Sequence, residues 1–130
     1  MGKEELSDIL MDHFNYPRNI GIIDYPNGEG CNGDPECGDY LEIYIRVENN
    51  LIEDISFLVF GCFGAIASGS MTMQLAKGKT LEEALKISEE DIVHALGGLP
   101  EDKKHCSNLG VNALRNAIDN YYIKEKKEWV

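Results

Sequence analysis

Alternating apolar and polar residues mark the middle of the chain, along residues 40–47. The apolar residues occupy every second position: Leu41, Ile43, Ile45 and Val47. A period of two predicts a strand with one buried face. Asn49-Asn50 then predicts a tight turn, and residues 52–60 the second strand of a hairpin. The preceding residues 17–39 are rich in Gly, Pro, Asn and Asp, which predicts a loop with a short third strand at residues 20–23.

Helical patterns lie before and after these strands. Residues 4–15 have apolar positions at helical spacing, and residues 65–77 combine small residues with Met71, Met73 and Leu75, which we interpret as core or interface packing. Thr80-x-x-Glu83 predicts a capping box for a short helix through Ile87, and Ser88 caps a predicted helix to Leu96. The last predicted helix is residues 105–125, with an apolar face made of Leu109, Ala113, Leu114, Ala117, Ile118 and Tyr121.

The order of these elements predicts the fold class. Strands are followed by helices, which is typical of an α+β protein. We therefore expect a small antiparallel three-stranded sheet, helices packed on one face of it, and a long C-terminal helix. The length of 130 residues suits a single domain over residues 1–130.

Charge narrows the possible partners. The chain has 12 Lys and Arg against 23 Asp and Glu, a net charge of −11. This balance argues against binding to nucleic acid or to an anionic membrane surface, because phosphates would be repelled. No apolar stretch approaches the ~18 residues of a membrane span, and the first five residues are too charged for a secretory signal. A cytoplasmic protein is therefore expected, in which cysteines are thiols or metal ligands and not disulfides.

Three of the four cysteines fall at the ends of predicted elements. They are Cys37 before the first hairpin strand, Cys62 after the second strand, and Cys106 at the start of the final helix. Helix N-termini favour thiolate over thiol, so Cys62 and Cys106 are predicted to be thiolates. Lys103 and Lys104 strengthen this prediction for Cys106.

These cysteines also form a candidate metal-binding set. Three thiolates suit Zn or the iron of an iron–sulfur cluster, and Asp39 or His105 would supply a fourth ligand. Four ligands match tetrahedral Zn or a [2Fe–2S] cluster. The cysteines lack the C-x-x-C pairs of most structural zinc sites, so spacing alone leaves both possibilities open.

Two other functional classes fit the residues less well. A cysteine-nucleophile enzyme would pair Cys106 with His105, but sequence neighbours rarely align as such a pair. The segment Gly28–Gly33 matches the G-x-G-x-x-G pattern of dinucleotide-binding loops, but Asp34-Pro35 follows it where a helix should begin. We interpret this match as accidental.

Three motifs together indicate a family. They are Cys37-Gly38-Asp39, Gly61-Cys62-Phe63-Gly64-Ala65-Ile66-Ala67-Ser68, and His105-Cys106-Ser107. With Asn15–Gly21 and Lys77–Ala84, they closely resemble the IscU/NifU-type iron–sulfur cluster assembly scaffold, and the resemblance covers nearly the whole chain.

The resemblance implies a function that is not enzymatic. Such scaffolds accept sulfur from a cysteine desulfurase, combine it with iron into a [2Fe–2S] cluster and transfer the cluster to apo acceptor proteins. By position, Cys37, Cys62 and Cys106 would be cluster ligands and sulfur acceptors, and Asp39 and His105 auxiliary ligands. We expect Cys106 to accept sulfur first, assisted by Lys103, and Asp39 to keep the cluster labile. Zn is able to use the same ligands in purified protein, and a structural zinc module is the alternative function.

The segment before Cys106 and the residue Cys31 depart from the family pattern. Leu99-Pro100-Glu101-Asp102-Lys103 stands where IscU-type members commonly have Leu-Pro-Pro-Val-Lys, the segment that a dedicated Hsp70-type chaperone grasps. The resemblance therefore implies such a chaperone as a partner, but the altered segment does not determine whether the chaperone recognises this chain. Cys31 has no counterpart in the family motifs, and we expect it not to be a ligand.

Overall fold

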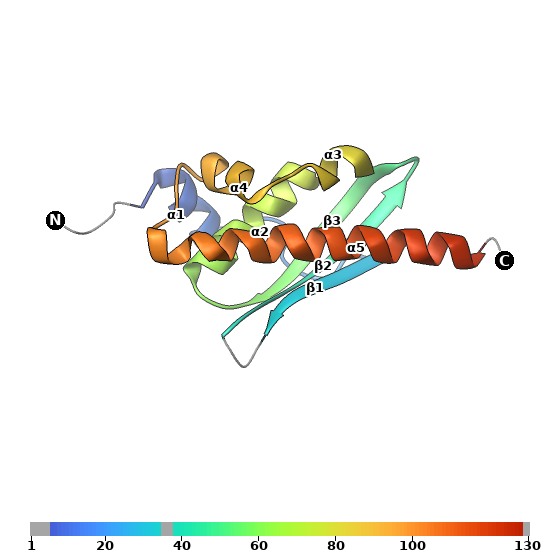
Figure 1. Cartoon of the computed structure of the whole chain (residues 1–130), viewed down its shortest axis with the longest axis horizontal. Coiled ribbons are helices and arrows are strands. Elements are labelled where there is room, and N and C mark those ends of the chain that lie inside the picture. The colour runs from blue at the N-terminus through green and yellow to red at the C-terminus, as the bar shows by residue number, and fades with distance from the viewer. Residues whose placement is uncertain (1–5, 35–37, 129–130) are drawn as a thin grey trace.

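The structure is a computed structural model that describes residues 6–34 and 38–128. A three-stranded sheet lies beneath several helices, of which the last spans the length of the molecule (Figure 1). In chain order the elements are α1 (Asp8–Asn15), β1 (Gly28–Asp34), β2 (Asp39–Glu48), β3 (Leu51–Phe60), α2 (Phe63–Ala76), α3 (Leu81–Leu85), α4 (Glu89–Ala95), the 3-10 helix η2 (Glu101–Cys106) and α5 (Ser107–Glu128). The predicted α+β class is confirmed.

The sheet has the order β1-β2-β3, and both strand pairs are antiparallel. The predicted hairpin is β2 and β3. Its turn residues Asn49 and Asn50 have φ values of 53° and 63°, which asparagine tolerates better than most residues. The turn prediction is thus confirmed, with its physical basis.

The third strand is not where the sequence predicted it. It is Gly28–Asp34, inside the predicted loop, whereas Ile20 makes only an isolated bridge to Phe57. A Cβ at Gly30 would lie 2.2 Å from the backbone nitrogen of Ala117 and 2.5 Å from the carbonyl oxygen of Ala113, both in α5. The glycine content that predicts a loop in fact allows a helix to pack directly on the strand.

The helices cover one face of the sheet, as predicted. In β2 the buried residues are those of the alternating pattern: Leu41, Ile43, Ile45 and Val47. α5 packs mainly against β1 and β2, and α2 against β3 (Figure 1). Met71 and Met73 are buried in the same core, which confirms their role in packing.

The helix ends agree with the capping signals and correct two boundaries. Thr80 forms the predicted capping box, and Ser88, predicted as a cap, forms a capping box with Asp91 as well. Helix α1 begins at Asp8 with Ser7 as its N-cap, so the predicted start at residue 4 is too early; residues 4 and 5 lie outside the described residues. His105 and Cys106 belong to η2, not to the long helix, which begins at Ser107.

Among the described residues, no helix is both long enough and apolar enough to cross a membrane.

Candidate metal site

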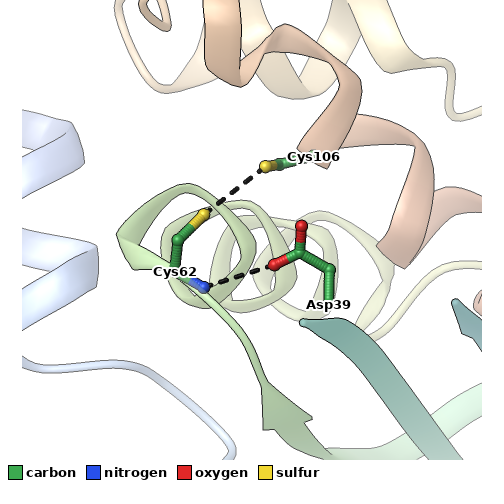
Figure 2. Close-up of side chains that lie close together, drawn as sticks. All are labelled: Asp39, Cys62 and Cys106. Atoms are coloured by element: carbon green, nitrogen blue, oxygen red, sulfur yellow. Dashed lines mark hydrogen bonds between the residues drawn. The ribbon is translucent and has the colours of Figure 1, made fainter. Parts of the chain in front are cut away.

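Three residues far apart in the sequence meet at one end of the sheet. Asp39 is the first residue of β2, Cys62 is the N-cap of α2 and Cys106 is the last residue of η2. One oxygen of Asp39 and the two sulfurs all lie within 4.8 Å of one another. Figure 2 shows the sulfurs of Cys62 and Cys106 directed at each other, with the Asp39 carboxylate beside them. We call these three residues the thiol–carboxylate cluster.

Short contacts hold the cluster together. The Sγ atoms of Cys62 and Cys106 are 3.7 Å apart, and the backbone N–H of Cys62 donates a 3.3 Å hydrogen bond to Oδ1 of Asp39 (Figure 2). Nε2 of His105 lies 3.7 Å from Oδ2 of Asp39 and 3.7 Å from Sγ of Cys106. The side chain of His105 is 64% exposed, so the imidazole borders the cluster from the solvent side.

Two glycines leave room for this arrangement. A Cβ at Gly61 would lie 2.5 Å from Oδ1 of Asp39, and a Cβ at Gly64 would lie 3.1 Å from Sγ of Cys106. Side chains at either position would push a ligand atom away from its neighbours. Both glycines belong to the motif around Cys62, but the motif did not predict that their missing side chains make room for the ligands.

An aromatic contact fastens η2 to the start of α2. Nζ of Lys103 lies 5.6 Å from the ring centroid of Phe63, within the range of a cation–π interaction. The Phe63 ring in turn meets Phe14 of α1 edge to face, with centroids 6.1 Å apart. Lys104 instead pairs with Glu101, 3.2 Å from its Oε2. Of the two lysines expected to act on Cys106, Lys103 is therefore the one that packs at the cluster.

The expectation that Cys106 is a thiolate is wrong for this arrangement. The residue is fully buried, and burial, followed by the nearby Cys62, raises the pKa of the Cys106 thiol to about 12. Lys103 acts in the opposite direction and does not compensate. Burial thus favours the thiol form of Cys106 in this arrangement, whereas a coordinated metal ion would favour the thiolate.

The structure places one of the remaining two cysteines, Cys31. Cys37 lies outside the described residues, next to Gly38. Cys31 is exposed and pairs with Glu42 across β1 and β2. Because Leu41 and Ile43 face the helices, Glu42 and Cys31 face the other side of the sheet. The expectation that Cys31 is not a ligand agrees with this placement.

The outer face around Cys31 has its own hydrogen-bond network. The hydroxyls of Tyr40 and Tyr44 donate to the two carboxylate oxygens of Glu42, at 2.7 Å and 2.6 Å. These bonds, that of Tyr44 first, lower the pKa of Glu42, and the bond to Glu42 raises the pKa of Tyr44 to about 12. The bond to Glu42 also raises the pKa of Tyr40.

The donor atoms of the thiol–carboxylate cluster suit a soft or borderline metal. Two sulfurs, a carboxylate oxygen and a neighbouring imidazole nitrogen match the ligands of Zn and of iron in iron–sulfur clusters. The site lies where three element ends meet, so small shifts of η2 change the distance between its ligands.

Comparison with known proteins points to one family. The family model described as "NifU-like N terminal domain" matches residues 5–128. The chain is 54% identical over 121 residues to the iron-sulfur cluster assembly scaffold protein IscU 1 of Archaeoglobus fulgidus, covering 93% of this chain and 79% of the relative. It is 45% identical over 123 residues to the iron-sulfur cluster assembly scaffold protein IscU of Aquifex aeolicus, covering 93% and 78%.

A solved structure shows the same fold. It is the N-terminal part of a nitrogen-fixing NifU-like protein from Brucella abortus, with a TM-score of 0.71 over 91% of this chain and 94% of that one. Because the sequence identity is 16%, this likeness concerns the fold alone.

Proposed function

Because the chain belongs to the family of NifU-like N-terminal domains, we propose that it is a scaffold on which an iron–sulfur cluster is assembled before transfer to other proteins. The observation that carries the proposal is the convergence of Asp39, Cys62 and Cys106, whose ligand atoms lie within 4.8 Å of one another. The names of the relatives in Archaeoglobus fulgidus and Aquifex aeolicus support it.

The cargo we propose is a [2Fe–2S] cluster, held by Cys37, Cys62 and Cys106 with Asp39 as the fourth ligand. His105 lies 3.7 Å from Asp39 and from Cys106, close enough to replace the carboxylate when the cluster forms or leaves. Iron and sulfide are the substrates of this process. The protein itself supplies ligands and a sulfur acceptor, so we propose no enzymatic turnover.

Sulfur would come from a cysteine desulfurase and first reach Cys106. The burial of this thiol means that η2 must move before a partner's persulfide can reach it. Lys103 would assist this sulfur transfer through its contact with Phe63, where its ammonium packs on the ring. Breaking this contact would let η2 move and expose Cys106, and forming it again would bury Cys106. Apo iron–sulfur proteins would then receive the finished cluster. The segment around Pro100, the N-cap of η2, is where an Hsp70-type chaperone would act if it recognises this degenerate motif.

Anaerobic reconstitution tests the proposal. The protein is incubated with ferrous iron and sulfide, desalted, and assayed for absorption and for iron and sulfide per chain. We expect charge-transfer bands and about two irons and two sulfides per cluster. Cys62→Ser should lose the cluster, whereas Cys31→Ser, which changes a cysteine on the opposite face of the sheet, should keep it. Protein that shows no charge-transfer bands but binds one Zn per chain when Zn is added instead would support the alternative, a structural zinc module.

The lability of the cluster is a separate part of the proposal. A carboxylate matches iron that is already bonded to sulfide less well than a thiolate does, so Asp39 should ease ligand exchange. We expect Asp39→Ala to slow transfer to an apo acceptor and to lengthen the lifetime of the cluster. Glu42→Ala, which removes a carboxylate from the outer face, is the control. Equal transfer rates and lifetimes in Asp39→Ala and wild type would contradict this role.

A further inference from the structure

We propose that Cys62 reduces a persulfide on Cys106 to sulfide by forming a disulfide with it. The inference rests on the proposed function, because sulfur must first arrive on Cys106. It adds an activity to the scaffold: the site would generate sulfide from delivered sulfur with electrons of its own.

The positions of the two sulfurs carry this inference. Their Sγ atoms are 3.7 Å apart, which is van der Waals contact, and a disulfide bond is about 2.05 Å long. An approach of about 1.7 Å therefore completes the bond. Cys62 is the N-cap residue of α2 and Cys106 the last residue of η2, so both sulfurs lie at element ends, where small adjustments disturb little regular structure.

The surroundings of Cys106 also favour an internal thiol as the reductant. The residue is fully buried, and its Sγ lies so close to Gly64 that a Cβ on that glycine would be only 3.1 Å away. Once η2 closes over a persulfide, external thiols are excluded from the inner sulfur. The sulfur of Cys62 is already in contact with that atom.

The proposed step balances. The proton of the Cys62 thiol first passes to the terminal sulfur of the Cys106 persulfide. The Cys62 thiolate then attacks Sγ of Cys106, and the bond between Sγ and the delivered sulfur breaks. The delivered sulfur leaves with that electron pair and the transferred proton, as hydrosulfide. It gains two electrons, and each cysteine sulfur loses one. A thiol or dithiol reductant must then open the disulfide before both cysteines can bind iron.

Attack on the outer sulfur is the competing outcome. It would move the delivered sulfur to Cys62 as a new persulfide and release no sulfide. The two reactions leave different products on the protein, namely a disulfide in one case and a Cys62 persulfide in the other.

The experiment loads the full chain with sulfur from glutathione persulfide, without oxygen and with a metal chelator. After rapid desalting, sulfide is trapped with a bimane reagent and the peptides are mapped by mass spectrometry without reduction. We expect about one sulfide for each Cys62–Cys106 disulfide. In Cys62→Ser the persulfide on Cys106 should persist and sulfide release should fall about tenfold or more. Serine is a favoured N-cap residue, so this variant keeps the start of α2.

Controls separate this step from other thiol chemistry. Cys31→Ser should release sulfide as wild type does, and Cys37→Ser should still form the Cys62–Cys106 disulfide. Unchanged sulfide release in Cys62→Ser, or a Cys62 persulfide without disulfide, would overturn the inference.

A second measurement needs no persulfide. Mild oxidation with diamide should link Cys62 to Cys106 in the metal-free protein, and failure to form this link would also overturn the inference. Wild-type protein that releases sulfide through Cys62 but never assembles a cluster from iron and sulfide would support this step and refute the proposed function alone.

Discussion

Replacement of Gly30 by alanine tests how α5 is held against the sheet. The added Cβ would lie 2.2 Å from the nitrogen of Ala117, 2.5 Å from the carbonyl oxygen of Ala113 and 2.7 Å from the carbonyl carbon of Asn116. All three are backbone atoms, so no side-chain rotation relieves the overlap. Non-bonded atoms normally approach to about 3.5 Å, and α5 must therefore move about 1 Å away from β1.

Two opposing free energies set the size of the effect. Overpacking of this kind costs about 3 kcal/mol, the upper end of the usual range. Alanine in place of glycine inside a strand returns about 0.5–1 kcal/mol of backbone entropy. The net loss is about 2 kcal/mol, which for a chain of this length lowers Tm by roughly 8 °C.

Thermal unfolding followed by circular dichroism measures this loss. Cys31→Ala is the matched control, because residue 31 follows Gly30 in β1 but is exposed on the other face, and its Tm should change by no more than about 2 °C. A Gly30→Ala variant as stable as wild type, or more stable, would show that strand propensity outweighs packing here and would refute the reasoning.

Three further predictions concern a helix cap, the contact over Phe63 and the outer face. Thr80→Ala removes the capping box of α3 and should cost about 1 kcal/mol in urea unfolding; no change in the midpoint would contradict it. Phe63→Leu removes a cation–π contact between η2 and α2 that is worth about 0.5–1 kcal/mol. Exposure of Cys106 should therefore become easier, and its alkylation by iodoacetamide should accelerate about two- to fivefold. An unchanged rate would show that the contact does not hold η2 over Cys106. Glu42→Gln should lower the pKa of Tyr44 from about 12 toward 10 in an ultraviolet titration. In wild type this raised pKa adds stability that is fully present below pH ~10 and is lost as the pH rises toward 12. An unshifted Tyr44 titration in the variant would exclude Glu42 as the cause of the raised pKa.

Local patterns predicted the hairpin and the caps because they depend on neighbouring residues. Period-two alternation determines which face of β2 is buried, and the left-handed backbone of Asn49 and Asn50 forms the turn from β2 to β3. Contacts of Asn50 with Leu81 and Glu82 then add to a turn that the local sequence already specifies. Thr80 and Ser88 bind backbone groups three residues away. Interactions of this kind can be predicted from a sequence. The strand β1 was missed because its glycines are required by close packing against α5, which lies more than 80 residues later in the chain.

The candidate site shows the same division. Motif resemblance identified Asp39, Cys62, His105 and Cys106, and the structure places all four near one another. The thiolate prediction for Cys106 was wrong, because helix ends and lysines are local features and burial is not. Sequence position shows that Lys103 precedes Cys106, but it does not show that the fold buries the Cys106 thiol away from water.

The sequence by itself determined the fold class, the hairpin, the helix caps and the residue types available to bind metal, since each depends on patterns within a few residues. Only the tertiary structure decided that β1 packs directly under α5, that Cys62 and Cys106 touch, and that burial raises the pKa of the Cys106 thiol. The physical reason is that steric fit and desolvation depend on which distant segments meet, and neither is encoded in the spacing of residues along the chain.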